Sequence, residues 1–105
     1  MTARFDVEAL KAFVGEKSFH RGDAYWRDGL VMILDMDATR VRAEVSGTES
    51  YRTTVIGKGA DISGDCSCPA FFDFGPCKHI AATALMVNDG ALIGDNGALK
   101  RIRAH

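Results

Sequence analysis

Three cysteines and one histidine occur within one short stretch of the sequence, residues 65–79. They form two pairs, Cys66-x-Cys68 and Cys77-x-His79, which are separated by eight residues. Three thiolates and one imidazole make a closed tetrahedral ligand set for zinc, of the kind that stabilises a fold. The spacing therefore predicts one structural Zn²⁺ bound by these four side chains. Its binding free energy is expected to be on the order of 10 kcal/mol, most of it expressed as folding.

The same four residues have alternative interpretations. Free cysteines are often buried in cores, and a redox pair usually has the spacing Cys-x-x-Cys. If Cys77 were a nucleophile with His79 as its base, a third group would have to orient the histidine, and none is evident. A catalytic zinc ion needs an open coordination position, which four protein ligands do not leave. We therefore expect no catalytic residue and no enzymatic activity.

The composition is that of one ordinary globular domain, with 105 residues, 47% of them hydrophobic and 26% charged. Its 13 basic and 14 acidic residues give a net charge of −1, without the basic excess common in nucleic-acid-binding proteins. No stretch has the ~20 apolar residues that cross a bilayer, and charges near the N-terminus argue against a signal peptide. We expect a cytoplasmic protein with no membrane contact and no small-molecule substrate, whose reduced thiols favour a metal over disulfides.

Two short helices are predicted before the first strand. Apolar residues recur at helical spacing over residues 5–14, with Asp6 as the expected N-cap and Gly15 as the end. A second helix is expected to begin near His20 or Arg21 and to end at Gly29. Its expected apolar side comprises Phe19, Ala24, Tyr25 and Trp26.

The second helix carries a group of residues with two interpretations. Arg21, Arg27 and Trp26 could form a cluster that contacts a ligand. Alternatively, Trp26 anchors the helix in the core while both arginines are solvated, because buried aromatic side chains usually serve packing. The sequence leaves both interpretations open.

An antiparallel meander of three or four strands is predicted for the middle of the chain. Residues 30–35 are an apolar run, residues 40–45 alternate polar and apolar side chains, and residues 50–56 are rich in Tyr, Thr, Val and Ile. Residues 60–66 are expected to be extended, after a turn at Gly57-Lys58-Gly59. Such short loops favour pairing between neighbouring antiparallel strands.

The second ligand pair is predicted to lie at the start of a helix over residues 78–88, where apolar residues recur at helical spacing. Pro69 ends the preceding strand, and residues 73–76 supply a turn. Residues two apart do not face each other on a helix, so Cys77 is expected in the turn before it and His79 in its first turn. The helix N-terminus then lowers the cost of deprotonating Cys77. Three rings are candidates to cover one side of the site: Phe71, Phe72 and Phe74.

These elements predict a small single domain of the α+β class. An N-terminal helical segment, residues 1–29, is expected to pack on the domain. Residues 30–90 contain the meander and the zinc-binding segment, whose core is residues 65–88 and which leads into a C-terminal helix. Residues 91–105 are expected to form a flexible tail, or a short helix from about Gly97 onward.

Five cations are candidates for contacts with nucleic-acid phosphates: Arg40, Arg42, Arg52, Lys58 and Lys78. The three arginines would lie on the exposed face of the meander. Because Glu44 and Glu49 lie among them, a mixed and solvated surface is the alternative.

The ligand pattern resembles the SWIM-type zinc finger, which has a C-x-C pair, a variable gap and a C-x-H pair. The flanks Cys66-Ser67-Cys68-Pro69 and Cys77-Lys78-His79-Ile80-Ala81-Ala82 are similar to those of prokaryotic members. So is the upstream pattern Arg21-Gly22-x-x-Tyr25-x-x-x-Gly29. The specific motif covers residues 66–79, and a looser resemblance covers residues 18–90.

The resemblance implies zinc binding by Cys66, Cys68, Cys77 and His79. It also implies a compact ββα-like finger, in which the last strand supplies the first pair and the helix the second. Family members serve as DNA-binding or protein–protein interaction modules, and many are attached to helicase-like or transposase-like chains. This sequence has no helicase motif and no glycine-rich phosphate loop. We expect a DNA-binding module. One alternative is a protein–protein adaptor that exposes one of the three phenylalanines; another is a purely structural finger attached to a larger protein.

Overall fold

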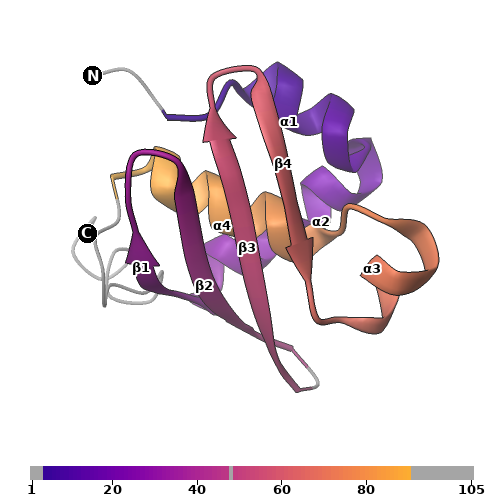
Figure 1. The fold of residues 1–105 in the computed structure, drawn as a ribbon. Coiled ribbons are helices and arrows are strands. Elements are labelled where there is room, and N and C mark those ends of the chain that lie inside the picture. The colour runs from indigo at the N-terminus through magenta and orange to yellow at the C-terminus, as the bar shows by residue number, and fades with distance from the viewer. Residues whose placement is uncertain (1–3, 48, 91–105) are drawn as a thin grey trace.

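Four consecutive strands form one antiparallel sheet in the order β1-β2-β3-β4 (Figure 1). The computed structural model describes residues 4–47 and 49–90. In these ranges the strands are β1 (Val31–Met36), β2 (Arg40–Ser46), β3 (Ser50–Lys58) and β4 (Asp61–Cys66). The sheet confirms the predicted meander and the α+β class.

One face of the sheet is buried and the other is exposed, because polar and apolar side chains alternate along the strands. The buried face contributes these residues to the core: Val31, Ile33, Val41, Ala43, Val45, Thr53 and Val55. The exposed face therefore carries the polar positions of the alternation, including the predicted arginines.

The helices α1 (Val7–Val14), α2 (Glu16–Arg27) and α4 (Lys78–Asn88) lie behind the sheet in Figure 1. Eight of the eleven residues of α4 are buried, because the helix packs on the sheet and also against α2. The predictions for α1 and α4 are confirmed. The side chain of Asp6 caps α1 by accepting a hydrogen bond of 2.8 Å from the Ala9 N–H.

The helix α2 differs from its prediction in two ways. It begins at Glu16, one turn earlier than predicted, because Gly15 (φ 89°) both ends α1 and precedes α2. Ala24 is exposed, and the buried residue of α2 is Gly22. A Cβ at Gly22 would lie only 2.6 Å from Ala81 Cβ. The close approach of α2 to α4 therefore requires glycine at this position.

Two predicted turns are also corrected. Gly57 and Lys58 belong to β3 and pair with the start of β4. The segment between the two ligand pairs contains a short helix, α3 (Pro69–Phe74), which was not predicted and which includes the first two residues of the turn predicted at 73–76. Proline is favourable at the first position of a helix, because an N–H at that position would have no acceptor within the helix. Pro69 therefore begins a helix.

The N-terminal segment is joined to the end of α4 by Phe5 and Asn88. Phe5 is fully buried, and its N–H donates to Asn88 Oδ1 at 2.8 Å. The Asn88 amide in turn donates to the Phe5 carbonyl at 2.8 Å. No helix within the described ranges is long and apolar enough to cross a membrane. The tail predicted for residues 91–105 lies outside these ranges.

Candidate metal centre

The two ligand pairs meet where the sheet ends and α4 begins. Cys66 is the last residue of β4, and Cys68 is the N-cap of α3, in an extended conformation. Cys77 is the N-cap of α4, and His79 lies in the first turn of that helix, as predicted. The resemblance implied that the last strand supplies both cysteines of the first pair. Only Cys66 belongs to the strand, because the chain turns into α3 directly after Ser67.

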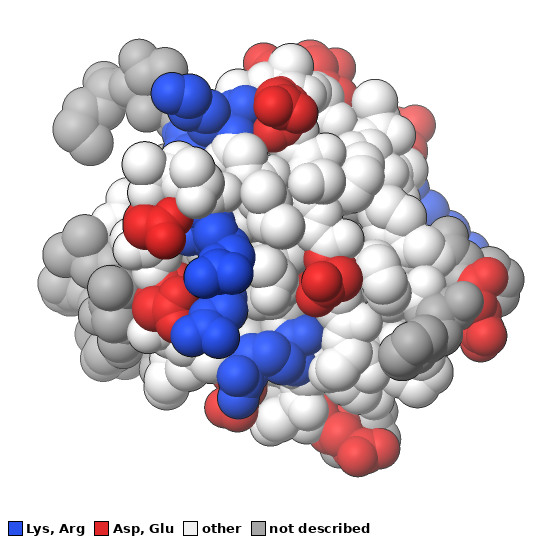
Figure 2. All heavy atoms as spheres, in the orientation of Figure 1, with Lys and Arg blue, Asp and Glu red and all other residues white. Residues whose placement is uncertain are grey.

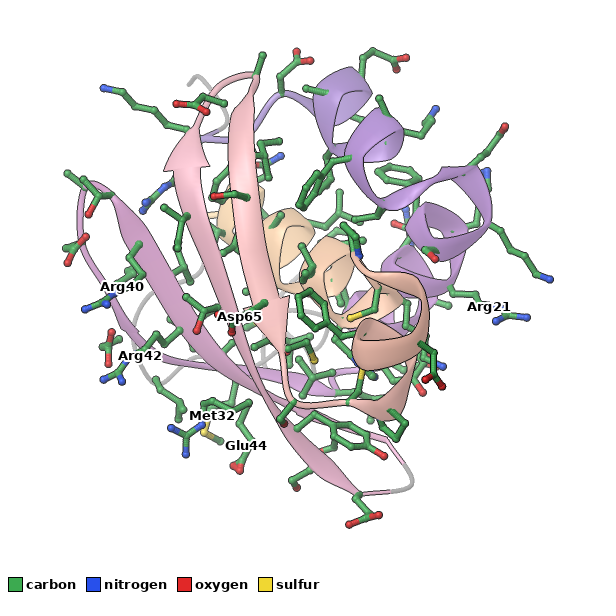
Figure 3. The ribbon with its side chains drawn as sticks, turned by 45° about the vertical axis from the view of Figure 1, so that its right-hand side comes forward. Arg21, Met32, Arg40, Arg42, Glu44 and Asp65 are labelled. Atoms are coloured by element: carbon green, nitrogen blue, oxygen red, sulfur yellow. The ribbon has the colours of Figure 1, made fainter. Side chains whose placement is uncertain are left out.

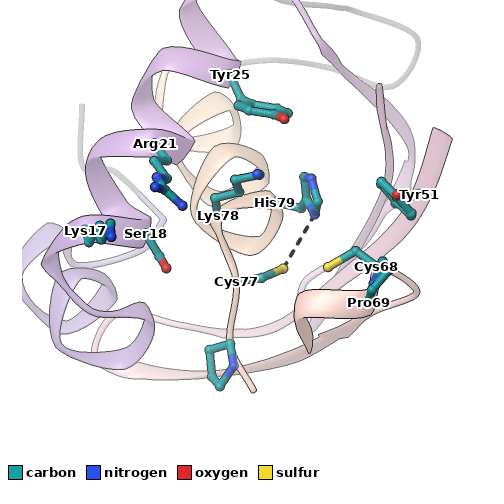
Figure 4. Close-up of a pocket in the computed structure, with 11 residues that line it drawn as sticks. Lys17, Ser18, Arg21, Tyr25, Tyr51, Cys68, Pro69, Cys77, Lys78 and His79 are labelled. Carbon is teal, nitrogen blue, oxygen red and sulfur yellow. Dashed lines mark hydrogen bonds between the residues drawn. The ribbon is translucent and has the colours of Figure 1, made fainter. Parts of the chain in front are cut away.

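The separations of the ligand atoms fit a tetrahedral metal site. The three sulfurs and a ring nitrogen of His79 all lie within 4.8 Å of one another. His79 Nδ1 lies 3.5 Å from Cys66 Sγ. It lies 3.7 Å from Cys77 Sγ, the contact drawn as a dashed line in Figure 4. Zinc–sulfur bonds of about 2.3 Å and zinc–nitrogen bonds of about 2.0 Å at tetrahedral angles separate sulfur from nitrogen by about 3.5 Å. The observed separations therefore suit zinc.

Burial and donor chemistry also fit a structural zinc ion. The four residues have exposed fractions of only 1% to 4%, and the three cysteines are free of disulfide bonds. Three sulfurs and one imidazole match the closed ligand sets of structural zinc sites. When bound, the ion would cross-link β4, the start of α3 and the start of α4.

The three thiols differ in their affinity for protons. A hydrogen bond with Cys77, assisted by His79 and Thr53, lowers the pKa of Cys66 to about 3. The same hydrogen bond, together with burial, raises the pKa of Cys77. The easier deprotonation predicted for Cys77 at the start of a helix is therefore wrong, because these two effects outweigh the lowering by the Ile80 N–H. Burial raises the pKa of Cys68. At neutral pH the metal-free cluster therefore holds a thiolate at Cys66 and protonated thiols at Cys68 and Cys77.

Strand β3 holds the first ligand pair in place. Thr53 is the strand partner of Cys66, and its hydroxyl lies 3.3 Å from Cys66 Sγ. The hydroxyl of Ser67 accepts a hydrogen bond of 3.0 Å from the Arg52 N–H. The Ser67 N–H also donates to the Arg52 carbonyl at 3.0 Å. These contacts fix the segment that leaves β4 beside β3.

Two tyrosines contact the ring of His79. The ring centroid of Tyr25 lies 5.4 Å from that of His79, and the ring centroid of Tyr51 lies 5.1 Å from it. The His79 Nε2 atom is buried and has no hydrogen-bond partner in the described part of the chain. A metal-bound histidine almost always donates its other N–H to an acceptor. With Nδ1 on the metal, that acceptor has to come from outside the described residues.

Three phenylalanines were predicted to cover one side of the metal site, and the structure describes the side chain of one of them, Phe71. Phe71 is half-buried and packs against the core. The side chains of Phe72 and Phe74 lie outside the described part of the structure.

The five predicted phosphate-binding cations lie on two surfaces. Arg40, Arg42 and Arg52 are on the exposed face of the sheet, and Lys58 is at the end of β3. Lys78 is the first residue of α4, behind the sheet. Figure 2 shows a band of basic side chains across the sheet face with acidic side chains beside it. The structure therefore does not bring the five cations together.

Acidic partners accompany the arginines of the sheet face. Arg42 forms an ion pair with Asp35, which lowers the pKa of the carboxyl group and raises that of the guanidinium. Arg52 lies directly opposite Glu44 in the pairing of β2 with β3. Figure 3 shows Glu44 and Asp65 on the same face as Arg40 and Arg42. The expected mixed, solvated surface describes this face well.

A cleft of about 520 Å³ lies between α2 and the start of α4 (Figure 4). Lys17, Arg21 and Lys78 line it, and no carboxylate does so among the described residues. Lys78 Nζ lies 5.1 Å from the ring centroid of Tyr25. The other lining residues are Ser18, Tyr25, Tyr51, Cys68, Pro69, Pro76, Cys77 and His79. The cleft is thus positively charged and adjoins the metal ligands.

The residues of α2 that were singled out in the sequence have separate roles. Arg21 lines the cleft, whereas Arg27 donates to Asp23 at 2.8 Å. Trp26 is half-buried and packs against the core. The packing interpretation therefore holds for Trp26, and the ligand-contact interpretation is left for Arg21 alone.

Several residues around the site were not predicted. Lys17 and Ser18 share a helix face with Arg21 and Tyr25 only when the helix begins at Glu16, and the late predicted start excluded them. The role of Thr53 depends on the strand register, which the sequence does not fix. Thr53 could have been recognised only from its position in the strand that pairs with the segment ending at Cys66.

The comparisons with known proteins agree with this geometry. Residues 51–88 match the family model described as SWIM zinc finger. The match covers β3, β4, α3 and α4 and includes all four ligand residues. It confirms the resemblance drawn from the sequence. No curated protein and no solved structure matches the chain.

Proposed function

We propose that the protein is a DNA-binding module with a structural zinc ion, a proposal that begins from the match of residues 51–88 to the SWIM zinc finger family model. The observation that carries the proposal is the cationic cleft beside the zinc ligands. Cations that neutralise phosphates supply most of the non-specific affinity of proteins for DNA. The proposal therefore assigns the phosphate contacts to the cleft.

The closed ligand set supports a structural role for the zinc ion. Four protein ligands complete a tetrahedron and leave no position for a substrate. Each ligand is buried, so the set is also shielded from solvent. We propose that Cys66, Cys68, Cys77 and His79 hold the binding surface in shape and take no part in catalysis.

The charges of the cleft support phosphate binding more strongly than those of the sheet. Lys17 and Arg21 are exposed, and neither has an ion-pair partner within residues 4–47 and 49–90. On a chain of net charge −1, such a local group of cations produces a positive potential that the whole molecule lacks. On the sheet face, carboxylates close to the arginines offset their charge.

The proposal is tested by titrating a fluorescent DNA oligonucleotide and measuring anisotropy at several salt concentrations. The variant Lys17→Gln/Arg21→Gln removes two charges from the cleft. It is expected to weaken binding and to reduce the slope of log affinity against log salt by about two. The matched variant Arg40→Gln/Arg52→Gln removes two exposed charges from the sheet and is expected to retain most of the affinity.

Two results would contradict the proposal. Absence of DNA binding at low salt would exclude a DNA-binding function. If the sheet variant lost binding and the cleft variant kept it, the contact surface would be the sheet face predicted from the sequence.

The alternative of a protein–protein adaptor has weaker support. Of the large apolar side chains exposed on the sheet face, Met32 and Ile56 are about 40% accessible. They lie in different cross-strand rows, and the row between them contains Asp35, Arg42 and Asp65. Charged residues thus divide the two apolar side chains, which do not make the contiguous patch typical of a protein interface.

A further inference from the structure

The cleft has two chemically different ends. Lys17, Ser18 and Arg21 line it from α2. The rings of Tyr25 and Tyr51 line it on the side of His79 (Figure 4). Lys78 also lines this end, with its Nζ 5.1 Å from the ring centroid of Tyr25. Its volume of about 520 Å³ falls within the range of sites that hold small molecules. A ligand that fills it therefore needs an anionic part and a planar, apolar part.

A buried atom beside the cleft also lacks an acceptor. His79 lines the cleft, is 97% buried, and has no partner for its Nε2 atom among the described residues. Nδ1 faces the sulfurs of Cys66 and Cys77, so Nε2 carries the proton when Nδ1 binds a metal. Nε2 itself has no accessible surface, so a ligand in the cleft does not contact it directly; the groups open to such a ligand are the cations and the tyrosine rings.

We infer that the cleft binds one unpaired nucleotide, so that the DNA target is single-stranded; this inference rests on the proposed function. The phosphate of the nucleotide lies with Lys17, Ser18 and Arg21, and its base lies against the tyrosines. Aromatic side chains reach the face of a base only where it is unstacked, as in a single strand.

A duplex fits the same surface less well. In a duplex the bases are stacked and their faces are covered, so only the cations of the cleft would make contacts. The rest of the exposed face of α2 carries paired side chains, with His20 near Glu16 and Arg27 bound to Asp23. A groove-binding helix would present such side chains free to the bases and phosphates.

The test compares three fluorescent DNA probes by anisotropy at low salt, with the zinc-loaded full chain. They are a mixed-sequence single strand, the duplex of that sequence, and a single strand of equal length in which abasic sites replace the bases. The single strand is expected to bind about tenfold more tightly than either of the others, because stacking on aromatic residues is lost in both.

Protein variants locate the binding site without disturbing the metal ligands. Arg21→Gln is expected to weaken binding of the single strand about tenfold. Arg27→Gln, on the same helix and also exposed, is the control and is expected to leave it unchanged. Circular dichroism and zinc content confirm that both variants are folded and loaded.

The outcomes separate this inference from the proposed function. If the duplex binds as tightly as the single strand, or the abasic strand as tightly as the intact one, the single-strand inference is wrong while DNA binding stands. The inference is also wrong if Arg21→Gln has no effect. If no probe binds at low salt, both proposals are wrong, and a partner other than DNA has to be sought.

Discussion

Gly22 of α2 lies directly against Ala81 of α4, and the space between them is too small for one additional carbon atom. A Cβ built on Gly22 would lie 2.6 Å from Ala81 Cβ and 2.6 Å from the Lys78 carbonyl oxygen. This contact sets how closely α2 approaches the helix that carries His79. It also sets the width of the cleft, because Arg21 and Tyr25 lie on the same helix as Gly22.

Gly22→Ala is therefore expected to destabilise the protein by about 1–3 kcal/mol through overpacking. A loss of stability would identify the close contact between the helices, because alanine in place of glycine at an exposed helix position stabilises a protein by about 1 kcal/mol. Thermal or urea unfolding of the zinc-loaded protein measures the change. Ala24→Gly, at an exposed position of the same helix, is the control. It is expected to lower the free energy of unfolding only by the difference in helix propensity between alanine and glycine, about 1 kcal/mol. A stabilised Gly22→Ala variant would show that the helices are not in close contact.

The side-chain amide of Asn88 forms hydrogen bonds with both main-chain groups of Phe5. It accepts from the Phe5 N–H and donates to the Phe5 carbonyl, both at 2.8 Å. Asn88→Ala is expected to lower the free energy of unfolding by about 1–3 kcal/mol, since it leaves both groups without their partner. Asn88→Asp keeps the acceptor and loses the donor, so it should fall between the wild type and the alanine variant. Equal stability of all three proteins in urea titrations would contradict this role.

Thr53 is expected to tune the metal affinity. Its hydroxyl lies 3.3 Å from Cys66 Sγ, and the hydrogen bond between them favours the thiolate. Thr53→Val keeps the shape and removes the hydroxyl, so zinc affinity should fall about tenfold, as for other residues that support metal ligands. Competition with a chromophoric chelator measures the affinity. Thr54→Val, the next residue along β3 and half-buried, is the control. An affinity unchanged by Thr53→Val would show that the hydroxyl has no influence on the metal.

Zinc binding is expected to release about two thiol protons near neutral pH. Cys66 is already a thiolate because its pKa is lowered to about 3, whereas Cys68 and Cys77 have raised pKa values and remain protonated. The metal-free state thus binds more protons than the zinc-bound state, so affinity rises with pH. Between pH 7 and pH 8 the affinity should increase by about two powers of ten.

A pH indicator in weakly buffered solution measures the released protons directly. Magnesium, which prefers oxygen ligands, serves as the control ion and should release none. Release of about three protons would mean that Cys66 is also protonated in the metal-free protein, and the hydrogen bonds to it would not stabilise the thiolate.

Much of the fold could be predicted because its signals are local. The cap of α1 at Asp6, the apolar spacing of α4 and the alternation along β2 each lie within one element. The ligand set could be predicted for the same reason, since two short pairs determine it. The placement of Cys77 and His79 followed from the spacing of side chains on a helix.

The remaining features depend on contacts between distant segments. Gly22 is buried because α4 lies against it, and the spacing of α2 alone favoured Ala24. Thr53 meets Cys66 only in the observed register of β3 with β4. The cleft combines side chains of α2 and α4, so its charge could not be recognised from the scattered cations of a chain with net charge −1.

Cys66, Cys68, Cys77 and His79 are expected to bind one metal ion together. Titration of the metal-free protein with Co²⁺, followed by absorption spectroscopy, tests it most directly, because tetrahedral cobalt with thiolate ligands has intense d–d and charge-transfer bands. We expect saturation at one cobalt per chain, loss of the bands when zinc is added, and a weakened, altered spectrum for Cys77→Ser. Weak bands typical of octahedral cobalt, or a spectrum that Cys77→Ser leaves unchanged, would contradict it.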